Sequence, residues 1–445
     1  MAASLYSWWH ENLDGMLPMR GLLSTFTNIR KHEILPTFVA GLFFFCVLTA
    51  LMVVRPAREA LGMSRGIEAI RWLFIGTVVV TLAVNPMFGL LVSRFRRMTF
   101  IASTYFFFAI GLLVFYALLV WTPTHIGQTS GQIFYIWFSV FNLFATMLFW
   151  ALMTDRFTPE QSERLFGAVA LGGTLGAIFG PWLASLLAKP FGTPFLLLVA
   201  AGFLILAVFS AWWLTWIRDE QHAESQLQST SHSLIGGSPW AGCLAVLKSP
   251  YLMGISIYVL IVAVMATLIY FTRLHMVAKL GLDTDTRTEI FARIDMISQI
   301  ATFALQALLT GHLMKKLGVA VTLALLPISV ALGFIGLAIF GTLAALIALD
   351  ATFKAMQRGV MRPARETLFT VLPRTDRYKS KAFIDTFVYR GGDVIGSQMD
   401  GLLKGLGMGL AGLASFAVPL AIIWMTLGLW LGHARNKQTS NGENP

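Results

Sequence analysis

The sequence predicts an all-α membrane protein with about twelve transmembrane helices in two six-helix halves. Hydrophobic residues make up 56% of the 445 residues and charged residues only 12%, whereas soluble domains carry about 25% charged residues. Apolar runs of about 20 residues, the length that crosses a bilayer, recur along the whole chain. A polar stretch rich in Gln, Ser and His, at 218–249, separates these runs into two groups.

The first group of expected spans lies at about 34–54, 72–94, 99–121, 131–153, 166–188 and 193–217. The second lies at about 250–272, 290–311, 318–340, 342–364, 382–403 and 409–432. The expected organisation is an N-terminal segment at 1–33, a first half at 34–217, a central cytoplasmic loop at 218–249, a second half at 250–433 and a tail at 434–445.

The N-terminal segment contains acidic residues and lacks the compact apolar core of a signal peptide. Leu5, Trp9, Leu13 and Met16 fall on one face of a helix. This pattern is typical of a helix that lies in the membrane interface, and a poorly ordered tail is the alternative.

The distribution of Lys and Arg predicts the orientation in the membrane. Basic residues cluster before the first span, at 94–97, at 315–316, at 374–381 and after the last span, whereas the connections after the third and ninth spans contain none. Because cytoplasmic loops are enriched in Lys and Arg, we expect both termini in the cytoplasm, with the protein in the cell (inner) membrane. The formal net charge of +11 is explained by these loops without a nucleic-acid partner.

Two of the basic loops share a motif, which begins with a glycine and ends with basic residues. Their key residues are Gly89, Arg94 and Arg97 in the first half and Gly311, Lys315 and Lys316 in the second. Both loops resemble the loop motif of the major facilitator superfamily, in which an acid follows the apolar residues. Ser93 and Lys315 stand at the position of that acid. The glycine allows close helix approach, and the cations anchor the loop at the cytoplasmic face.

Gly172, Gly176 and Gly180 follow one another at four-residue spacing in the fifth span. This spacing places them on one face of the helix, where the missing side chains permit close contact with a neighbouring backbone. We expect a packing role for these glycines.

Charged residues inside the spans are the main candidates for a site, because they are costly in a bilayer. The tenth span carries Asp350, Lys354, Arg358 and Arg362 at four-residue spacing, followed by Arg365, so these side chains form a winding stripe along one helix face. The stripe predicts either a cavity that binds anions or an internal salt-bridge network. The excess of cations favours the cavity.

Two further spans add polar side chains to this expected cavity. The eighth span contributes Asp295, Gln299 and Gln306 along one face. The eleventh contributes Asp385, Arg390 and Asp393, and Arg390 is the natural partner either of Asp393 or of a substrate anion.

A seven-residue motif occurs twice, and six of its positions agree. Arg55, Arg58 and Glu59 belong to the first copy, which ends the first helix, and Arg362, Arg365 and Glu366 belong to the second, which ends the tenth. We hypothesise two matching gates on opposite faces of one pathway, in which the arginines hold an anion and the glutamate closes an ion pair when the site is empty. Coincidence combined with loop anchoring is the alternative.

These motifs are similar to those of the nucleotide transporter (ATP:ADP antiporter) family and its bacterial relatives. The end of the first helix resembles that family's Arg-x-x-Lys-Asp-x-Leu, and 378–393 resembles its entry into the eleventh helix. The resemblance implies the major facilitator fold and exchange of a nucleotide for another nucleotide or phosphate. It also implies a lysine within the first helix, whereas residues 34–54 carry no charge, so another organic anion is the alternative.

Other classes of protein fit the sequence less well. The chain has no G-x-x-x-x-G-K-[ST] loop for ATP phosphates and no clustered His, Asp, Glu or Cys typical of an enzyme or metal site. We therefore expect no enzyme, cofactor or metal. We expect a monomer that binds a small anionic substrate, and a general major facilitator transporter of a drug, sugar or other metabolite is the alternative.

Overall fold

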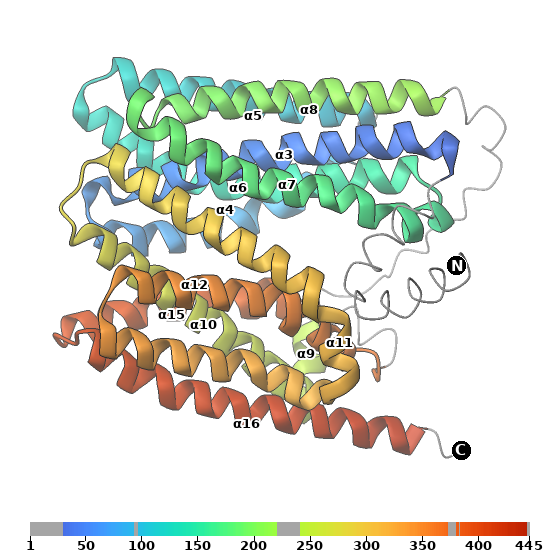
Figure 1. The fold of residues 1–445 in the computed structure, drawn as a ribbon, viewed down its shortest axis with the longest axis vertical. Coiled ribbons are helices and arrows are strands. Elements are labelled where there is room, and N and C mark those ends of the chain that lie inside the picture. Colours follow the sequence, from blue (N-terminus) through green and yellow to red (C-terminus); the bar gives the residue numbers. More distant parts are fainter. Residues whose placement is uncertain (1–29, 93–96, 220–240, 373–379, 382, 443–445) are drawn as a thin grey trace, which may run out of the picture.

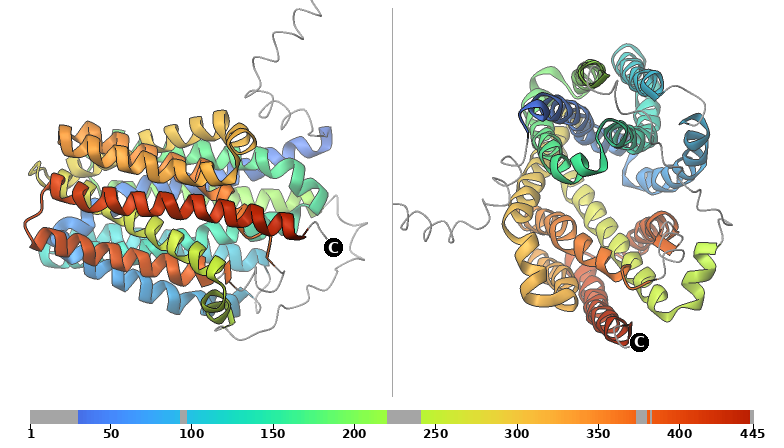
Figure 2. Two further views of the ribbon diagram at one scale, coloured as in Figure 1. Left: turned by 90° about the horizontal axis from the view of Figure 1, so that it is seen from below. Right: turned by 90° about the vertical axis from the view of Figure 1, so that its right-hand side faces the viewer.

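The computed structural model describes residues 30–92, 97–219, 241–372, 380–381 and 383–442. These residues form long helices that run side by side in two groups, one above the other in Figure 1 and seen end-on in Figure 2. The first group comprises η2 (Lys31–Glu33), α3 (Ile34–Gly62), η3 (Met63–Arg65), α4 (Ile67–Val92), α5 (Arg97–Trp121), α6 (Thr124–Arg156), α7 (Pro159–Phe191) and α8 (Phe195–Asp219).

The second group begins with the short helix α9 (Ala241–Lys248), which lies within the expected central loop. It continues with α10 (Pro250–Ala278), α11 (Thr284–Phe340), α12 (Leu343–Met356), the π-helical turn η4 (Gln357–Met361), α13 (Arg362–Leu368), the π-helical turn η5 (Ile384–Val388), α15 (Tyr389–Gly405) and α16 (Leu410–Gly442). Within α11, Gly318 has a φ of 70°, a conformation that glycine adopts without strain. This residue reverses the chain between the eighth and ninth spans.

Hydropathy accounts for most of the expected spans. In the described part of the chain, nine helices are long and apolar enough to cross a membrane. The expected spans at 290–311, 342–364 and 382–403 are absent from this set because they carry the charged residues that the sequence pointed to. They form helices nonetheless, so the all-α architecture with two six-helix halves is confirmed.

Each half has its own hydrophobic core. One cluster of buried side chains comes almost entirely from α3–α8, and a second comes from α9–α16. A smaller third cluster joins the halves and includes Tyr135 and Met63 of the first half with Phe271, Leu274 and Phe291 of the second. This joining cluster lies at the end of the molecule away from the start of α3 and the end of α16, which we name the distal end. The opposite end is the proximal end.

The three glycines of α7 form a seam with α3, as the sequence predicted. A Cβ atom on Gly172 would lie 2.2 Å from the carbonyl oxygen of Gly41, and one on Gly176 would lie 2.4 Å from that of Phe45. In the second half, Gly392 and Gly396 of α15 approach α10 in the same way. These two glycine seams bring backbones together inside each half.

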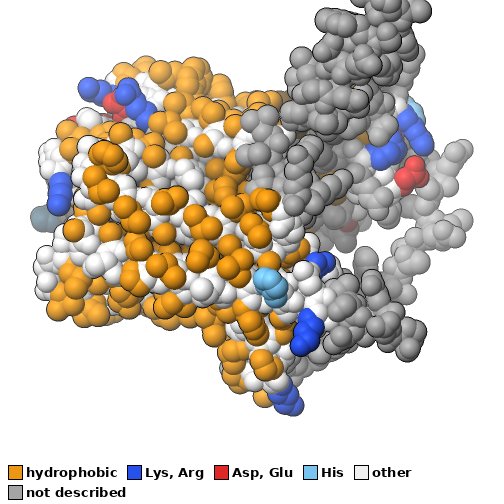
Figure 3. Space-filling model, turned by 60° about the horizontal axis from the view of Figure 1, so that its bottom comes forward, with side chains coloured by type: hydrophobic (Ala, Val, Ile, Leu, Met, Phe, Trp, Pro, Cys, Tyr) orange, Lys and Arg blue, Asp and Glu red, His pale blue; other side chains and the backbone are white. Residues whose placement is uncertain are grey.

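The first helix extends beyond the apolar span expected at 34–54 and includes the first motif copy. It continues eight residues beyond the expected end at residue 54, to Gly62, and includes Pro56. Arg55, Arg58 and Glu59 end the apolar run, but they belong to the helix and lie inside the protein, where they have partners on other helices. The surface differs from this buried region. On the face that Figure 3 shows, hydrophobic side chains cover the middle and charged side chains lie towards the ends.

Several expectations lie outside the described residues. The interfacial helix at residues 1–29 and Arg94 belong to this group. Gly89, Arg97, Gly311, Lys315 and Lys316 lie in described helices, but their side chains do not belong to the described part.

Candidate functional site

A cavity of about 450 Å³ lies between the two halves, near the middle of the long helices. Arginines from both halves line it together with aromatic and neutral polar side chains. The lining includes Met52, Arg55, Arg58, Glu59, Phe74, Thr77, Phe138, Ser139, Asn142, Thr267, Tyr270, Arg358, Tyr389, Arg390 and Asp393. Six of the candidate site residues from the sequence line this cavity: Arg55, Arg58, Glu59, Arg358, Arg390 and Asp393. A seventh, Gln299, accepts a hydrogen bond from Arg358.

A group of ion pairs and hydrogen bonds closes the distal side of this cavity, and we call it the distal network. It consists of Arg55, Arg58, Glu59, Tyr135, Tyr270, Arg273, Asp295, Asp350 and Lys354. Arg273 of α10 is its centre and is only 1% exposed. Its guanidinium lies 3.0 Å from Asp295, 3.9 Å from Glu59 and 4.0 Å from Asp350. One cation thus faces three buried carboxylates on three different helices.

Arg58 and Glu59 connect the first half to this centre. The Arg58 guanidinium stacks on the ring of Tyr135 at 3.6 Å and donates to the Tyr135 carbonyl, to Ser139 and to Glu59 at 3.2–3.3 Å. Glu59 is 1% exposed and accepts a hydrogen bond from Tyr270 of the second half. These partners stabilise both charges in a buried position, as the low-dielectric surroundings require.

Asp295, Asp350 and Lys354 connect α11 to α12. Lys354 Nζ lies 3.2 Å from Asp295 and 2.7 Å from Asp350, and Asp350 also accepts a hydrogen bond from Ser298 at 3.1 Å. The salt-bridge alternative for the stripe is therefore correct for Asp350 and Lys354. It does not describe Arg358, whose guanidinium donates to Gln299 Oε1 at 2.6 Å.

The stripe of the tenth span divides at η4. Asp350 and Lys354 precede this π-helical turn and belong to the distal network, whereas Arg362 and Arg365 follow it. A π turn contains more residues than an α turn, so it changes the direction in which the following side chains project. The sequence pattern predicted a winding stripe on a regular α-helix, and the π-helical turn is an irregularity that the pattern does not show.

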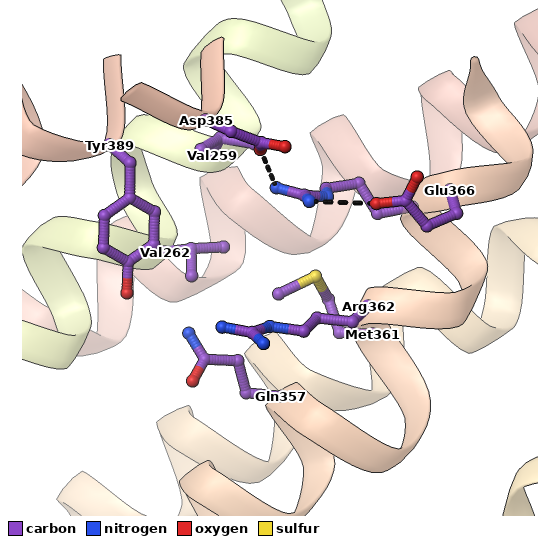
Figure 4. Close-up of a pocket in the computed structure, with 9 residues that line it drawn as sticks. Val259, Val262, Gln357, Met361, Arg362, Glu366, Asp385 and Tyr389 are labelled. Carbon is purple, nitrogen blue, oxygen red and sulfur yellow. Dashed lines mark hydrogen bonds and ion pairs between the residues drawn. The ribbon is translucent and has the colours of Figure 1, made fainter. Parts of the chain in front are cut away.

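Arg362 and Arg365 lie at a second cavity of about 410 Å³, closer to the proximal end. Arg365 donates to Asp385 at 2.7 Å and to Glu366 at 3.2 Å, as Figure 4 shows, and Lys381 lies 2.5 Å from Glu366. Arg362 points into the cavity beside Gln357 and Tyr389, and it forms no ion pair with another described residue. Within the described part of the chain, the ion pairs of the second motif copy lie in the second half, whereas those and the hydrogen bonds of the first copy involve both halves.

Of the remaining predicted residues, Arg390 and Asp393 line the main cavity and Gln306 does not. Arg390 pairs with Asp393 at 3.0 Å, and Thr267 of α10 donates to the same carboxylate at 3.4 Å. Gln306 lies on α11 beside η4, where a Cβ atom on Gly359 would be 3.3 Å from the Gln306 side chain.

Positively charged side chains outnumber negatively charged ones at this site. The distal network together with Arg358 contains five cations, Arg55, Arg58, Arg273, Lys354 and Arg358, and three acids, Glu59, Asp295 and Asp350. Arg390 and Asp393 balance each other. The excess of two positive charges makes the cavity suitable for an anion with more than one negative charge.

Sequence reasoning missed three central side chains of the network. Arg273 follows directly after the expected seventh span, and Tyr135 and Tyr270 lie in apolar runs. It also missed a second inter-half contact at the distal end, where Asp400 lies 3.1 Å from Arg71 and 3.0 Å from His275. A lone arginine near the end of an apolar helix was the one available signal for Arg273.

Comparisons with known proteins identify the family and similar folds. A model of the Major Facilitator Superfamily matches residues 37–360. The fold is similar to the POT family transporter PepTSo, with 12% identity, coverage of 91% of this chain and 98% of that chain, and a TM-score of 0.63. It is also similar to a bacterial homolog of the human lysosomal transporter Spinster in an inward-facing and unoccupied conformation, with 12% identity, coverage of 92% of this chain and 98% of that chain, and a TM-score of 0.60. The nucleoside transporter NupG is similar as well, with 13% identity, coverage of 92% of this chain and 99% of that chain, and a TM-score of 0.57. No curated protein matches the sequence.

Proposed function

Because the chain belongs to the major facilitator superfamily, we propose that it is a secondary transporter that moves an organic anion by alternating access. The observation that carries this proposal is the excess of cations around a cavity between the two halves. Charged side chains at membrane depth typically mark a substrate path. Substrate sites of such transporters lie near the bilayer midplane, between repeated units.

We propose a nucleotide as the substrate, exchanged for another nucleotide or phosphate. Phe74, Phe138 and Tyr389 line the cavity together with the arginines, so a planar ring and a charged group can be bound side by side. The similarity of the helix-end motifs to those of nucleotide transporters supports the same substrate. Thr77, Ser139 and Asn142 form a neutral polar wall on the first half, which fits the hydroxyl groups of a sugar.

The basic loops support an inner-membrane location with both termini in the cytoplasm. In this orientation the proximal end faces the cytoplasm and the distal network closes the external side. We propose a monomer as the transporting unit, since each chain contains a complete inter-half cavity.

Uptake of labelled ATP, ADP and other organic anions into proteoliposomes tests this function, with and without internal counter-substrate. Nucleotide flux that requires internal nucleotide or phosphate supports exchange. Uptake without counter-substrate would reject exchange, and flux of a neutral drug or sugar with no anion flux would reject the anion proposal itself.

Replacement of Arg358 by glutamine should lower anion uptake by roughly 10- to 100-fold, because a charge-assisted hydrogen bond to the substrate contributes about 1.5–3 kcal/mol. Arg293→Gln is the matched control, since Arg293 is 64% exposed and pairs with Glu289 on the surface of α11. Initial rates normalised to folded protein measure the effect. Equal rates for the two variants would show that Arg358 does not contact the substrate.

The two copies of the motif support the hypothesis of a gate on each side of the cavity. Arg58→Gln and Arg365→Gln should each reduce transport at least about tenfold while folded protein is retained, because each arginine holds charged partners at its end of the cavity. Size-exclusion profiles separate loss of transport from loss of fold. Wild-type rates in both variants would rule out the gates.

A further inference from the structure

Arg55 is the most weakly held cation of the distal network. Its one ion pair within the described chain joins Nε to Asp295 Oδ2 at 3.6 Å, which is beyond hydrogen-bond distance. Asp295 Oδ2 is buried, and no described residue donates a hydrogen bond to it. The Arg55 side chain is 24% exposed and lines the main cavity. A ligand in the cavity can therefore reach Arg55.

Arg58, one helical turn further along α3, is held in a different way. It stacks on Tyr135 and donates hydrogen bonds to three groups. Its side chain is 15% exposed. The two arginines of the first motif copy thus differ: Arg58 is held by several hydrogen bonds, whereas Arg55 forms none with the residues that the structure describes.

Arg358 offers a second binding group from the opposite half. It lines the same cavity, and its guanidinium donates to the neutral amide of Gln299 instead of to a carboxylate. Gln299 and Asp295 lie four residues apart on α11, so the neighbours of Arg358 and Arg55 occupy adjacent turns of one helix. An oxyanion placed between the two arginines would join α3 of the first half to η4 of the second.

We propose that Arg55 is a ligand-responsive link: an oxyanion that enters the cavity binds between Arg55 and Arg358 and thereby separates Arg55 from Asp295. This inference rests on the proposed transport of an anion and adds the subsite and its coupling to the distal network. A ligand with two negative charges fits best, because it neutralises both arginines and can offer oxygens to each guanidinium.

The remaining contacts of Asp295 make this exchange feasible. When Arg55 leaves, Asp295 Oδ1 still lies 3.0 Å from Arg273 and 3.2 Å from Lys354. No buried charge loses all its partners, which would be strongly unfavourable. The ligand replaces this contact by a bridge inside the cavity, between Arg55 and Arg358. The distal network itself then holds the halves together by one contact fewer, so ligand binding lowers the free-energy cost of opening the distal end.

Binding measurements on Asp295→Asn test the competition between Asp295 and the ligand. With inorganic pyrophosphate and ADP as probes, this variant should bind roughly two- to tenfold more tightly than wild type, because the competing carboxylate is removed. Asp350→Asn is the matched control: it removes the same charge from a similarly buried site that contacts Lys354 instead of Arg55. A purely structural role for Asp295 would not tighten binding.

Distances across the distal end test the coupling. Spin labels at Ile126 of α6 and Leu280 after α10, both about half exposed, report on the separation of the halves in a chain whose Cys46 and Cys243 are replaced. Pyrophosphate or ADP should shift the distances to longer values in this chain and leave Arg55→Gln unchanged.

The outcomes separate this inference from the proposed function. Equal affinities of Asp295→Asn and Asp350→Asn, or equal distance shifts with and without Arg55, would overturn the link while transport of an anion stands. If wild type binds neither probe and takes up no organic anion, the proposed function itself is wrong, and the link falls with it.

Discussion

Replacement of Gly172 by alanine is expected to destabilise the first half by about 3 kcal/mol or more, at the upper end of the cost of overpacking. The added Cβ atom would lie 2.2 Å from the Gly41 carbonyl oxygen and 2.7 Å from the Gly41 carbonyl carbon. Since both are backbone atoms, no rotation of a side chain relieves the overlap, and α3 and α7 must separate. Unfolding temperature in detergent and the yield of monodisperse protein measure the effect.

Gly202→Ala is the matched control for this substitution. Gly202 lies in α8, and a Cβ atom there would meet nothing within 4 Å. Alanine has a helix propensity about 1 kcal/mol better than glycine, so this variant should be as stable as wild type or more stable. If both variants had the same stability as wild type, the close α3–α7 contact would not exist in the folded protein.

Replacement of Arg273 by methionine is expected to cost about 3–5 kcal/mol, the usual effect of removing one partner from a buried ionic group. Arg273 is 1% exposed and faces Glu59, Asp295 and Asp350, so its loss leaves three buried carboxylates with fewer cations. Thermal unfolding in detergent measures the change. The distal spin-label distances should also lengthen, because Arg273 joins α10 to a carboxylate of the first half.

Arg293→Met provides the comparison for Arg273→Met. Its side chain is 64% exposed and pairs with Glu289 on the same helix, so its replacement should change stability by less than about 1 kcal/mol. A stable Arg273→Met protein with unchanged distal distances would show that the distal network does not depend on its central cation.

Much of the fold could be predicted because the bilayer imposes a simple rule on sequence. Long apolar runs identified most spans, and the Gly172 series identified a close helix contact correctly. The charged spans were also predicted, because each still contains an apolar run of about the length that crosses a bilayer. Arg358, Arg390 and Asp393 line one cavity, and the sequence could single them out because charged side chains are rare at membrane depth.

The pairing of charges could not be predicted, because it depends on contacts between helices far apart in sequence. Arg55 pairs with Asp295, 240 residues away by number, instead of with the neighbouring Glu59. Arg273 follows directly after the expected span 250–272, so it resembled a residue at a helix end. Its burial depends on partners from three other helices, which the sequence does not show. The π turn at η4 does not alter the hydropathy pattern, so the division of the charged stripe at this turn could not be predicted from the sequence.

The glycine seams and the distal network have opposite consequences for anyone who wants a more stable protein. The seams lie within one half each, so a substitution that improves packing beside them stabilises every conformation in which the halves stay intact. The distal network joins the halves in one conformation, so a substitution that strengthens it stabilises that conformation alone. Heat-resistant variants with substitutions in the distal network should therefore transport substrate slowly. Heat-resistant variants with substitutions within one half should keep their transport activity.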